Sequence, residues 1–318
     1  MQTDHLRFGY TPSIHLLPLL HPLLAGWVYP TGLQLDLVAL PPADLEQALA
    51  AGDLDGGLVH PLTYSRLRGR LEAMPGIGLA SEGSNSMVVL QSAARPDTLD
   101  GATVTLDPSA IGGLGPALLT TLARPYFDIT LTLAPPPEQG APPQPPTTAT
   151  QPSTLNPQHS TLVLYAGDAA VRARLPWLRY EARFSPSTLA AEERALAKGR
   201  PLAPDPQPAP APDPSTAGYA EDLGAAWWIF SGTPMVWALG VVRATLLEQP
   251  AAVVALVRAF EASRTAAREQ AATVLTAAAA AAAVPEAVVQ AIFDRQRPDL
   301  DARAQGGLAA FLRAKTQE

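Results

Sequence analysis

Apolar and polar positions alternate along some stretches of the chain and follow helical spacing along others. Residues 34–40 (QLDLVAL) alternate like a half-buried strand, and residues 43–51 continue with helical spacing, with Asp44 in the first turn and Gly52 after the last. Further strands are expected at 6–10, 54–59, 86–91, 102–106, 127–133, 162–166 and 235–242. Further helices are expected at 19–25, 62–70, 115–123, 188–198, 222–230, 250–277, 285–295 and 302–315. Strands that alternate with helices predict an α/β protein with largely parallel sheets.

Proline is concentrated in two places. Of the 34 prolines in 318 residues, nine lie in residues 134–158 and seven in residues 201–214. The rest of the chain has close to the ordinary proline content of about 5%, and it is long and apolar enough for about two domains. We interpret the segments near 134–158 and 201–216 as Pro-rich disordered insertions; the alternative is a polyproline recognition motif.

Composition narrows the class of partner. The chain has no cysteine and a formal net charge of -7, without a basic stripe, so thiolate chemistry is excluded and nucleic acid is not expected as a partner. Residues 1–10 lack the charged and apolar regions of a signal peptide, and the apolar stretch 16–27 is too short to span a membrane. We therefore expect a cytoplasmic protein with no membrane partner.

Polar residues follow several of the expected strands, at positions where α/β proteins contact ligands. His15 and His60 each follow a strand and a loop, although a lone histidine is more often structural. Gly112 and Gly113 open a helix just after Ser109, so their N–H groups could hold an anion; the alternative is a tight turn. No pair of histidines has metal-ligand spacing, and no nucleotide-binding loop occurs, so neither a metal nor a cofactor is expected.

A second polar loop, residues 81–86 (SEGSNS), runs into an expected strand. Ser84, Asn85 and Ser86 offer hydrogen-bond donors without bulk, which suits the recognition of a carboxylate. The alternative is a surface turn.

Residues 222–243 (DLGAAWWIFSGTPMVWALGVVR) resemble the segment D-L-G-x-x-W-x-x-x-T-G-x-P-x-x-x-A of the menaquinone biosynthesis family of the futalosine pathway. That family includes chorismate dehydratases and 1,4-dihydroxy-6-naphthoate synthases. Four other stretches resemble family segments in the same order: 55–64 (DGGLVHPLTY), 75–92 (PGIGLASEGSNSMVVLQS), 164–170 (LYAGDAA) and 306–315 (GGLAAFLRAK). Together they cover most of the chain outside the two Pro-rich segments.

The resemblance implies a fold like that of type II periplasmic binding proteins, with two α/β lobes, a cleft, two crossing strands and a helical C-terminus. It places the crossings near residues 87–91 and 235–242. Lobe one would then be 1–88 plus 235–318, and lobe two 89–234 with both Pro-rich insertions.

The resemblance also implies a lyase that dehydrates chorismate to 3-[(1-carboxyvinyl)oxy]benzoate, with a small carboxylate as its substrate. His15 takes the position of a catalytic asparagine, and Ser86 lies one residue before the position of a catalytic serine, which is Met87 here. These two are the expected catalytic residues. The residues expected to bind substrate are Ser13, Ser84, Asn85, Ser109, Gly112, Gly113 and Asp168.

The chain departs from the family pattern at several further positions, including Thr63 in place of a glutamate and Ile111 in a loop that binds an anion. These departures leave two alternatives open. The protein could be a non-catalytic binding protein for a small carboxylate, or it could have an activity like that of the naphthoate synthases.

Overall fold

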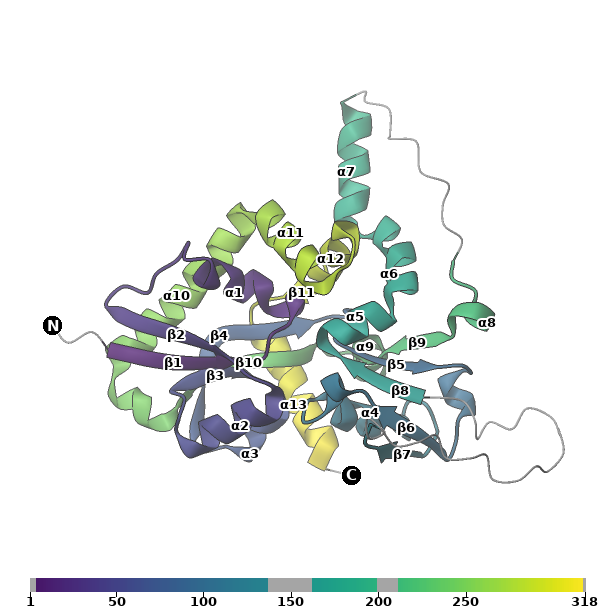
Figure 1. Cartoon of the computed structure of the whole chain (residues 1–318), viewed down its shortest axis with the longest axis horizontal. Helices are drawn as coiled ribbons and strands as arrows, with labels where there is room; N and C mark the ends of the chain where they lie inside the picture. Colours follow the sequence, from purple (N-terminus) through teal and green to yellow (C-terminus); the bar gives the residue numbers. More distant parts are fainter. Residues whose placement is uncertain (1–3, 137–161, 199–210, 317–318) are drawn as a thin grey trace.

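Two β-sheets lie side by side in the structure, which is a computed structural model that describes residues 4–136, 162–198 and 211–316 (Figure 1). The first sheet has the strand order β11-β4-β10-β3-β1-β2. Its strands are β1 (Asp4–Tyr10), β2 (Leu33–Ala39), β3 (Gly56–Val59), β4 (Leu71–Ser81), β10 (Met235–Arg243) and β11 (Gln296–Arg297). β1 is parallel to β2 and β3, whereas β10 is antiparallel to β3 and β4. The sheet is therefore mixed, with a parallel half and an antiparallel half.

The second sheet repeats this plan with the order β7-β6-β8-β5-β9. Its strands are β5 (Val88–Ser92), β6 (Ala102–Leu106), β7 (Leu131–Ala134), β8 (Leu162–Ala166) and β9 (Tyr219–Asp222). β6 is parallel to β7 and β8, and β5 is antiparallel to β8 and β9. Because parallel strands end at the same edge, the loops after them gather at one edge of each sheet.

The chain passes between the sheets twice, first between Ser81 and Val88 and again between Asp222 and Met235. Below, lobe one means residues 4–81 and 235–316, which carry the first sheet, and lobe two means the described residues of 88–222. The sequence-based division into 1–88 plus 235–318 and 89–234 stays a prediction.

Helices cover both sheets. Their bounds are α1 (Leu17–Leu24), α2 (Pro42–Ala51), α3 (Pro61–Arg66), α4 (Gly115–Ala123), α5 (Gly167–Ala173), α6 (Leu175–Glu181), α7 (Pro186–Ala197), α8 (Pro214–Ala217), α9 (Leu223–Ser231), α10 (Pro250–Glu269), α11 (Ala271–Ala282), α12 (Glu286–Phe293) and α13 (Ala302–Thr316). Single-turn 3₁₀ helices are η1 (Ile14–Leu16), η2 (Pro96–Thr98), η3 (Pro108–Ala110), η5 (Ala182–Phe184) and η6 (Ala244–Glu248). Helix α7 projects from the body of the molecule (Figure 1).

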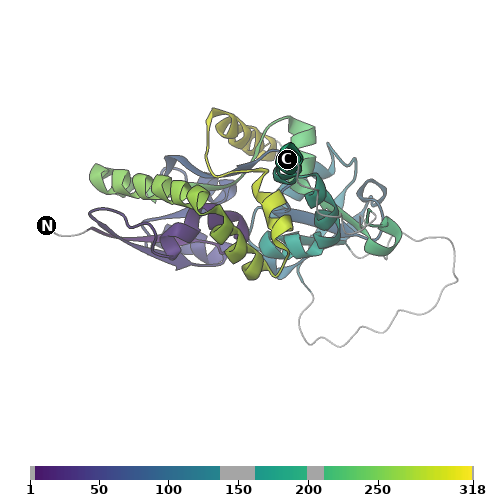
Figure 2. The same cartoon turned by 90° about the horizontal axis from the view of Figure 1, so that it is seen from above.

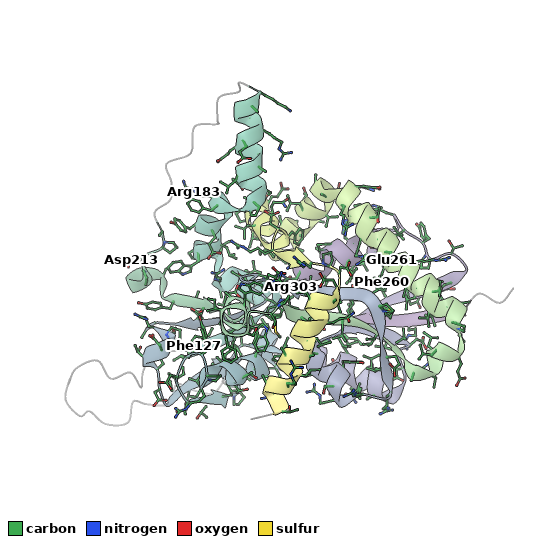
Figure 3. All side chains as sticks on the ribbon, turned by 180° about the vertical axis from the view of Figure 1, so that it is seen from behind. Phe127, Arg183, Asp213, Phe260, Glu261 and Arg303 are labelled. Atoms are coloured by element: carbon green, nitrogen blue, oxygen red, sulfur yellow. The ribbon has the colours of Figure 1, made fainter. Side chains whose placement is uncertain are left out.

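Two long helices hold lobe one together. Helix α10 lies along lobe one in Figure 2, where Phe260 packs against Phe8 of β1 with ring centroids 5.0 Å apart. Helix α13 crosses the back of the molecule where the lobes meet (Figure 3). Its Phe311 is fully buried against Trp227 of α9, with ring centroids 5.6 Å apart. Helix α10 thus packs on the sheet of lobe one, and α13 packs against α9, which lies in the second passage between the lobes.

The structure corrects several expected elements. Strand β4 was not expected, because Pro75 and Gly76 interrupt the apolar pattern; the strand accommodates them with Gly76 at φ 67°. The strand expected at 127–133 begins only at Leu131, since Asp128 turns the chain with φ 55°. Helices α5 and α6 fill a stretch with no expected helix, and the long helix expected at 250–277 breaks at Gln270.

The Pro-rich segments are described only in part. Most of both lies outside the residues that the structure describes. At the described ends, Ala134 belongs to β7, and the last residues of the second segment belong to α8. Over the described residues, no single helix has the length and apolarity to cross a membrane; the bent pair α11 and α12 passes that test by length and composition alone.

Candidate active site

A cavity of about 580 Å³ opens between the two lobes. Lobe one lines it with the loop after β1, the start of α2 and the turn after β3, and lobe two lines it with the loop before α4 and the start of α5. This volume lies in the range of about 300–1,000 Å³ that is typical of small-molecule sites. Most of the lining side chains are apolar, including Leu58, Met87, Val88 and Trp237, so a few polar groups decide what the cavity can bind.

Two of the expected residues, Ser13 and Asp168, meet across the cleft. Asp168 lies in the first turn of α5 in lobe two, and its Oδ1 accepts hydrogen bonds from Ser13 Oγ (3.0 Å) and Ile14 N (2.9 Å) in lobe one. Both residues line the cavity. Both bonds use Oδ1, so the other carboxylate oxygen of Asp168 has no partner among the described residues.

His60 makes a second link across the cleft. It is the N-cap of α3, where Nδ1 accepts from Thr63 N (3.3 Å), and its Nε2 lies 3.2 Å from the carbonyl oxygen of Gly112. Burial lowers the pKa of His60 to about 4, so the ring is neutral near pH 7 and its Nε2–H donates to Gly112. Gly112 has φ 69° and lies against Ala43, which explains the glycine at this position. His60 lines the cavity, whereas Gly112 does not.

The loop before α4 faces the cavity through Ser109 and Gly113. Asp107 caps the turn by accepting from Ser109 N (2.9 Å) and Ser109 Oγ (2.6 Å), and Ser109 Oγ in turn accepts from Ala166 N (3.1 Å). The N–H groups of Leu114 and Gly115, at the start of α4, have no acceptor within the helix and lie at the cavity wall. This part of the wall can therefore accept an anionic group.

Ser84, Asn85 and Ser86 do not line the cavity. Instead, the buried carboxylate of Asp222 holds this loop: Oδ2 accepts from Ser84 Oγ (2.8 Å) and from Ser86 N (2.6 Å). Asn85 is buried and accepts from Met87 N (3.1 Å). The expectations that Ser84 and Asn85 bind substrate and that Ser86 is catalytic are therefore not supported by the placement of these residues, since their polar groups stabilise the passage between the lobes.

His15 also lies away from the cavity. It is fully buried in η1, where its Nδ1 hydrogen-bonds with Gln296 Nε2 and its Nε2 has no partner among the described residues. Burial lowers its pKa to about 4, against the opposing influence of Asp168 and Asp222. Like Ser86, His15 does not face the space that a substrate could occupy, and Met87 is the residue of this region that does.

Some cavity residues were not expected from the sequence. Arg172 of α5 and Thr11 after β1 both line the cavity. No helix was expected at 167–173, so nothing in the sequence indicated that Arg172 follows Asp168 by one helical turn and faces the same side. Among the described residues, no group of three His, Asp or Glu side chains could hold a metal ion.

Comparisons with known proteins agree on the fold. The structure of protein AF1704 from Archaeoglobus fulgidus matches with a TM-score of 0.64 at 12% identity, covering 100% of this chain and 98% of that chain. The periplasmic aliphatic sulphonate binding protein SsuA from Escherichia coli matches with a TM-score of 0.54 at 15% identity, covering 99% and 87%. The CA3427 gene product of Candida albicans, described with the generic periplasmic binding protein fold, matches with a TM-score of 0.56 at 8% identity, covering 99% and 91%. The expected periplasmic-binding-protein fold is thus confirmed.

Sequence comparison adds the family. No curated protein sequence matches the chain. A family model described as menaquinone biosynthesis matches residues 212–317. The resemblance to the menaquinone biosynthesis family is therefore confirmed over this C-terminal third of the chain, which holds Asp222, α9 and β10.

Proposed function

We propose that the protein is a lyase of menaquinone biosynthesis that binds chorismate in the cavity between the lobes and dehydrates it to 3-[(1-carboxyvinyl)oxy]benzoate. The observation that carries this proposal is the cavity of about 580 Å³, apolar over most of its wall and bounded by carboxylate-binding groups, in a chain that matches the menaquinone biosynthesis family. Ring hydroxyl and a neighbouring proton leave together as water, and the ring becomes aromatic. The driving force therefore lies in the substrate, and the protein has to bind, orient and exclude bulk water.

Each part of the wall has a role in this proposal. The apolar side chains of Met87, Val88 and Trp237 pack against the ring. The free N–H groups at the start of α4 bind one carboxylate. The unpartnered oxygen of Asp168 accepts the ring proton and passes it to the departing hydroxyl, which leaves as water, while Ser13 Oγ and Ile14 N hold the carboxylate group of Asp168 in place through Oδ1.

The test is to incubate the purified protein with chorismate and follow the aromatic product by absorbance and chromatography. We expect Asp168→Asn to lower turnover by about 100-fold or more, the usual contribution of a positioned proton acceptor. The control variant is Asp36→Asn, which replaces an exposed aspartate of β2 outside the cavity. Absence of aromatic product from folded wild-type protein would reject the proposal.

A second candidate, a non-catalytic binding protein for a small carboxylate, is favoured by one observation. Met87 faces the cavity at the position where the family resemblance places a catalytic serine, while Ser86 and His15 face away from it. Calorimetric binding of chorismate without any turnover would select this candidate.

A further inference from the structure

The polar side chains around the cavity fall into two groups. Most of them are already hydrogen-bonded within the protein. Thr63 Oγ1 donates to Glu46 (2.5 Å) and Trp237 Nε1 donates to Ser81 Oγ (2.8 Å), and Ser13, His60 and Ser109 have the partners given above. Among the described residues that line the cavity, Arg172 and Thr11 have polar side chains with no hydrogen bond or ion pair at all, and Asp168 keeps one carboxylate oxygen without a partner.

Arg172 contrasts with Arg174, two residues further along. Arg174 is buried and fully used: it donates to Ser84 Oγ (2.7 Å) and Ala220 O (3.3 Å), and it pairs with Glu181 (2.5 Å). Arg172 lies in the last turn of α5, four residues after Asp168 and on the same face, and it is exposed and lines the cavity, whereas Arg174 is the C-cap that follows the helix. Arg174 therefore stabilises the fold, whereas the guanidinium of Arg172 is available to bind a ligand.

The side chains of Arg172 and Thr11 indicate the chemical class of the ligand. A guanidinium presents a planar fork of N–H donors that matches the two oxygens of a carboxylate. Thr11, half-buried in the loop after β1, offers a hydroxyl from the opposite lobe. The same cavity is lined by the apolar side chains of Leu16, Leu58 and Met87. A ring that carries one carboxylate and one hydroxyl would satisfy both groups and bury the rest of its surface.

From this arrangement we infer that Arg172 anchors a ligand carboxylate and that Thr11 selects a ring hydroxyl, so the two residues together determine specificity for hydroxylated cyclic carboxylates. This inference rests on the carboxylate ligand of the proposed function and names the side chains that recognise it. It needs no catalysis, so it can stand or fall independently of turnover.

The experiment uses simple probes: benzoate, benzamide and 3-hydroxybenzoate, titrated into the full-length protein by calorimetry. Wild-type protein should bind benzoate more tightly than benzamide. Arg172→Gln should weaken benzoate binding by about tenfold or more, because a charge-assisted pair is lost, and leave benzamide unchanged. The matched control is Arg179→Gln, which replaces an exposed arginine of α6 outside the cavity. Thr11→Val should remove the preference for 3-hydroxybenzoate over benzoate.

Two results would overturn the inference: no benzoate binding to folded wild-type protein, or equal benzoate affinity in wild type and Arg172→Gln. If Arg172→Gln does not fold, Arg172→Lys replaces it, since a lysine keeps the charge but loses the fork; it should weaken benzoate binding severalfold, and unchanged affinity would again overturn the inference. Turnover of chorismate with unchanged benzoate affinity in the variant would leave the proposed function standing and reject only the role of Arg172. Arg172-dependent benzoate binding without turnover of chorismate would support the role of Arg172 and reject the proposed function.

Discussion

The buried carboxylate of Asp222 joins the start of α9 to the loop of Ser84 and Ser86. It is 3% exposed and caps α9 by accepting from Gly224 N (2.8 Å), while its other oxygen binds the loop of Ser84 and Ser86. Asp222→Ala would leave these buried donors without an acceptor and should lower the free energy of unfolding by about 3 kcal/mol. Urea unfolding measures this loss, with Asp36→Asn as a surface control that should change stability by less than about 0.5 kcal/mol. A loss for Asp222→Ala no larger than the control's would show that the network contributes nothing.

His15 gives the protein a dependence on pH. Its folded pKa of about 4 lies below the ordinary value of 6.5 because the ring is buried. The folded state therefore favours the neutral ring, so the stability that His15 contributes is complete above pH 6.5 and is lost as pH falls toward 4. Between these limits, wild type should lose about 3 kcal/mol more than His15→Gln, from about 1.4 kcal/mol per pKa unit. Parallel stability curves for the two proteins from pH 7 to 4 would contradict this.

At the residue scale, the sequence shows which side chains could bind a ligand, but not which of them face the cavity. Ser13, Ser109, Gly113 and Asp168 were expected at the site and do line the cavity. Ser84, Asn85 and Ser86 offered the same kinds of donor, but Asp222, more than a hundred residues away in the chain, takes them up. No local pattern could indicate a partner so distant in sequence. The backbone conformation of Ser86 was not predictable from the sequence either, because its φ of 57° is one that serine rarely adopts.

At the element scale, helix α13 contains two adjacent glycines with opposite surroundings. A Cβ on Gly307 would overlap the carbonyl oxygen of Pro234, just before β10, whereas one on Gly306 would meet nothing within 4 Å. Gly307→Ala should therefore cost about 3 kcal/mol of unfolding free energy, because the helix must move away from the turn. Gly306→Ala is the matched control and should stabilise by about 0.5–1 kcal/mol through helix propensity. Equal effects of the two substitutions on the urea midpoint would show that α13 does not pack closely here.

Elements with a clear period and clear ends were predictable, and the others were not. The bounds of α4 and β8 agree with expectation, since α4 is apolar over two turns after a glycine loop and β8 is an uninterrupted apolar run. Strand β4 was missed because its pairing with β10, not its local sequence, stabilises a strand that contains Pro75 and Gly76. Helix α5 was missed because its seven residues are too few to show a helical period.

At the scale of the whole molecule, hydrogen bonds join the two lobes across the cleft. Asp168 and Gly112 from lobe two accept from Ser13, Ile14 and His60 of lobe one. The two-lobed fold itself was predictable, because the resemblance in residues 222–243 concerns the second passage between the lobes. The identity of the cross-lobe contacts was not, since each joins residues that lie far apart in the sequence and meet only when both sheets are in place.

The first Pro-rich segment should be dispensable for this architecture. On β6, Ala134 at the end of β7 lies beside Thr105, and Leu162 at the start of β8 lies opposite Val104. With strands about 4.8 Å apart, these ends are separated by about 10 Å. Because β7 and β8 are both parallel to β6, which lies between them, the connection has to cross a face of β6, and such a crossover takes about a dozen residues. The deletion variant therefore carries a Gly/Ser linker of about ten residues in place of 136–157. This variant should keep the urea midpoint and the benzoate affinity of the wild type. A deletion of equal length shifted to 132–153 removes most of β7 and should lose several kcal/mol of stability. Loss of cooperative unfolding or of benzoate binding in the 136–157 variant would show instead that the segment supports lobe two.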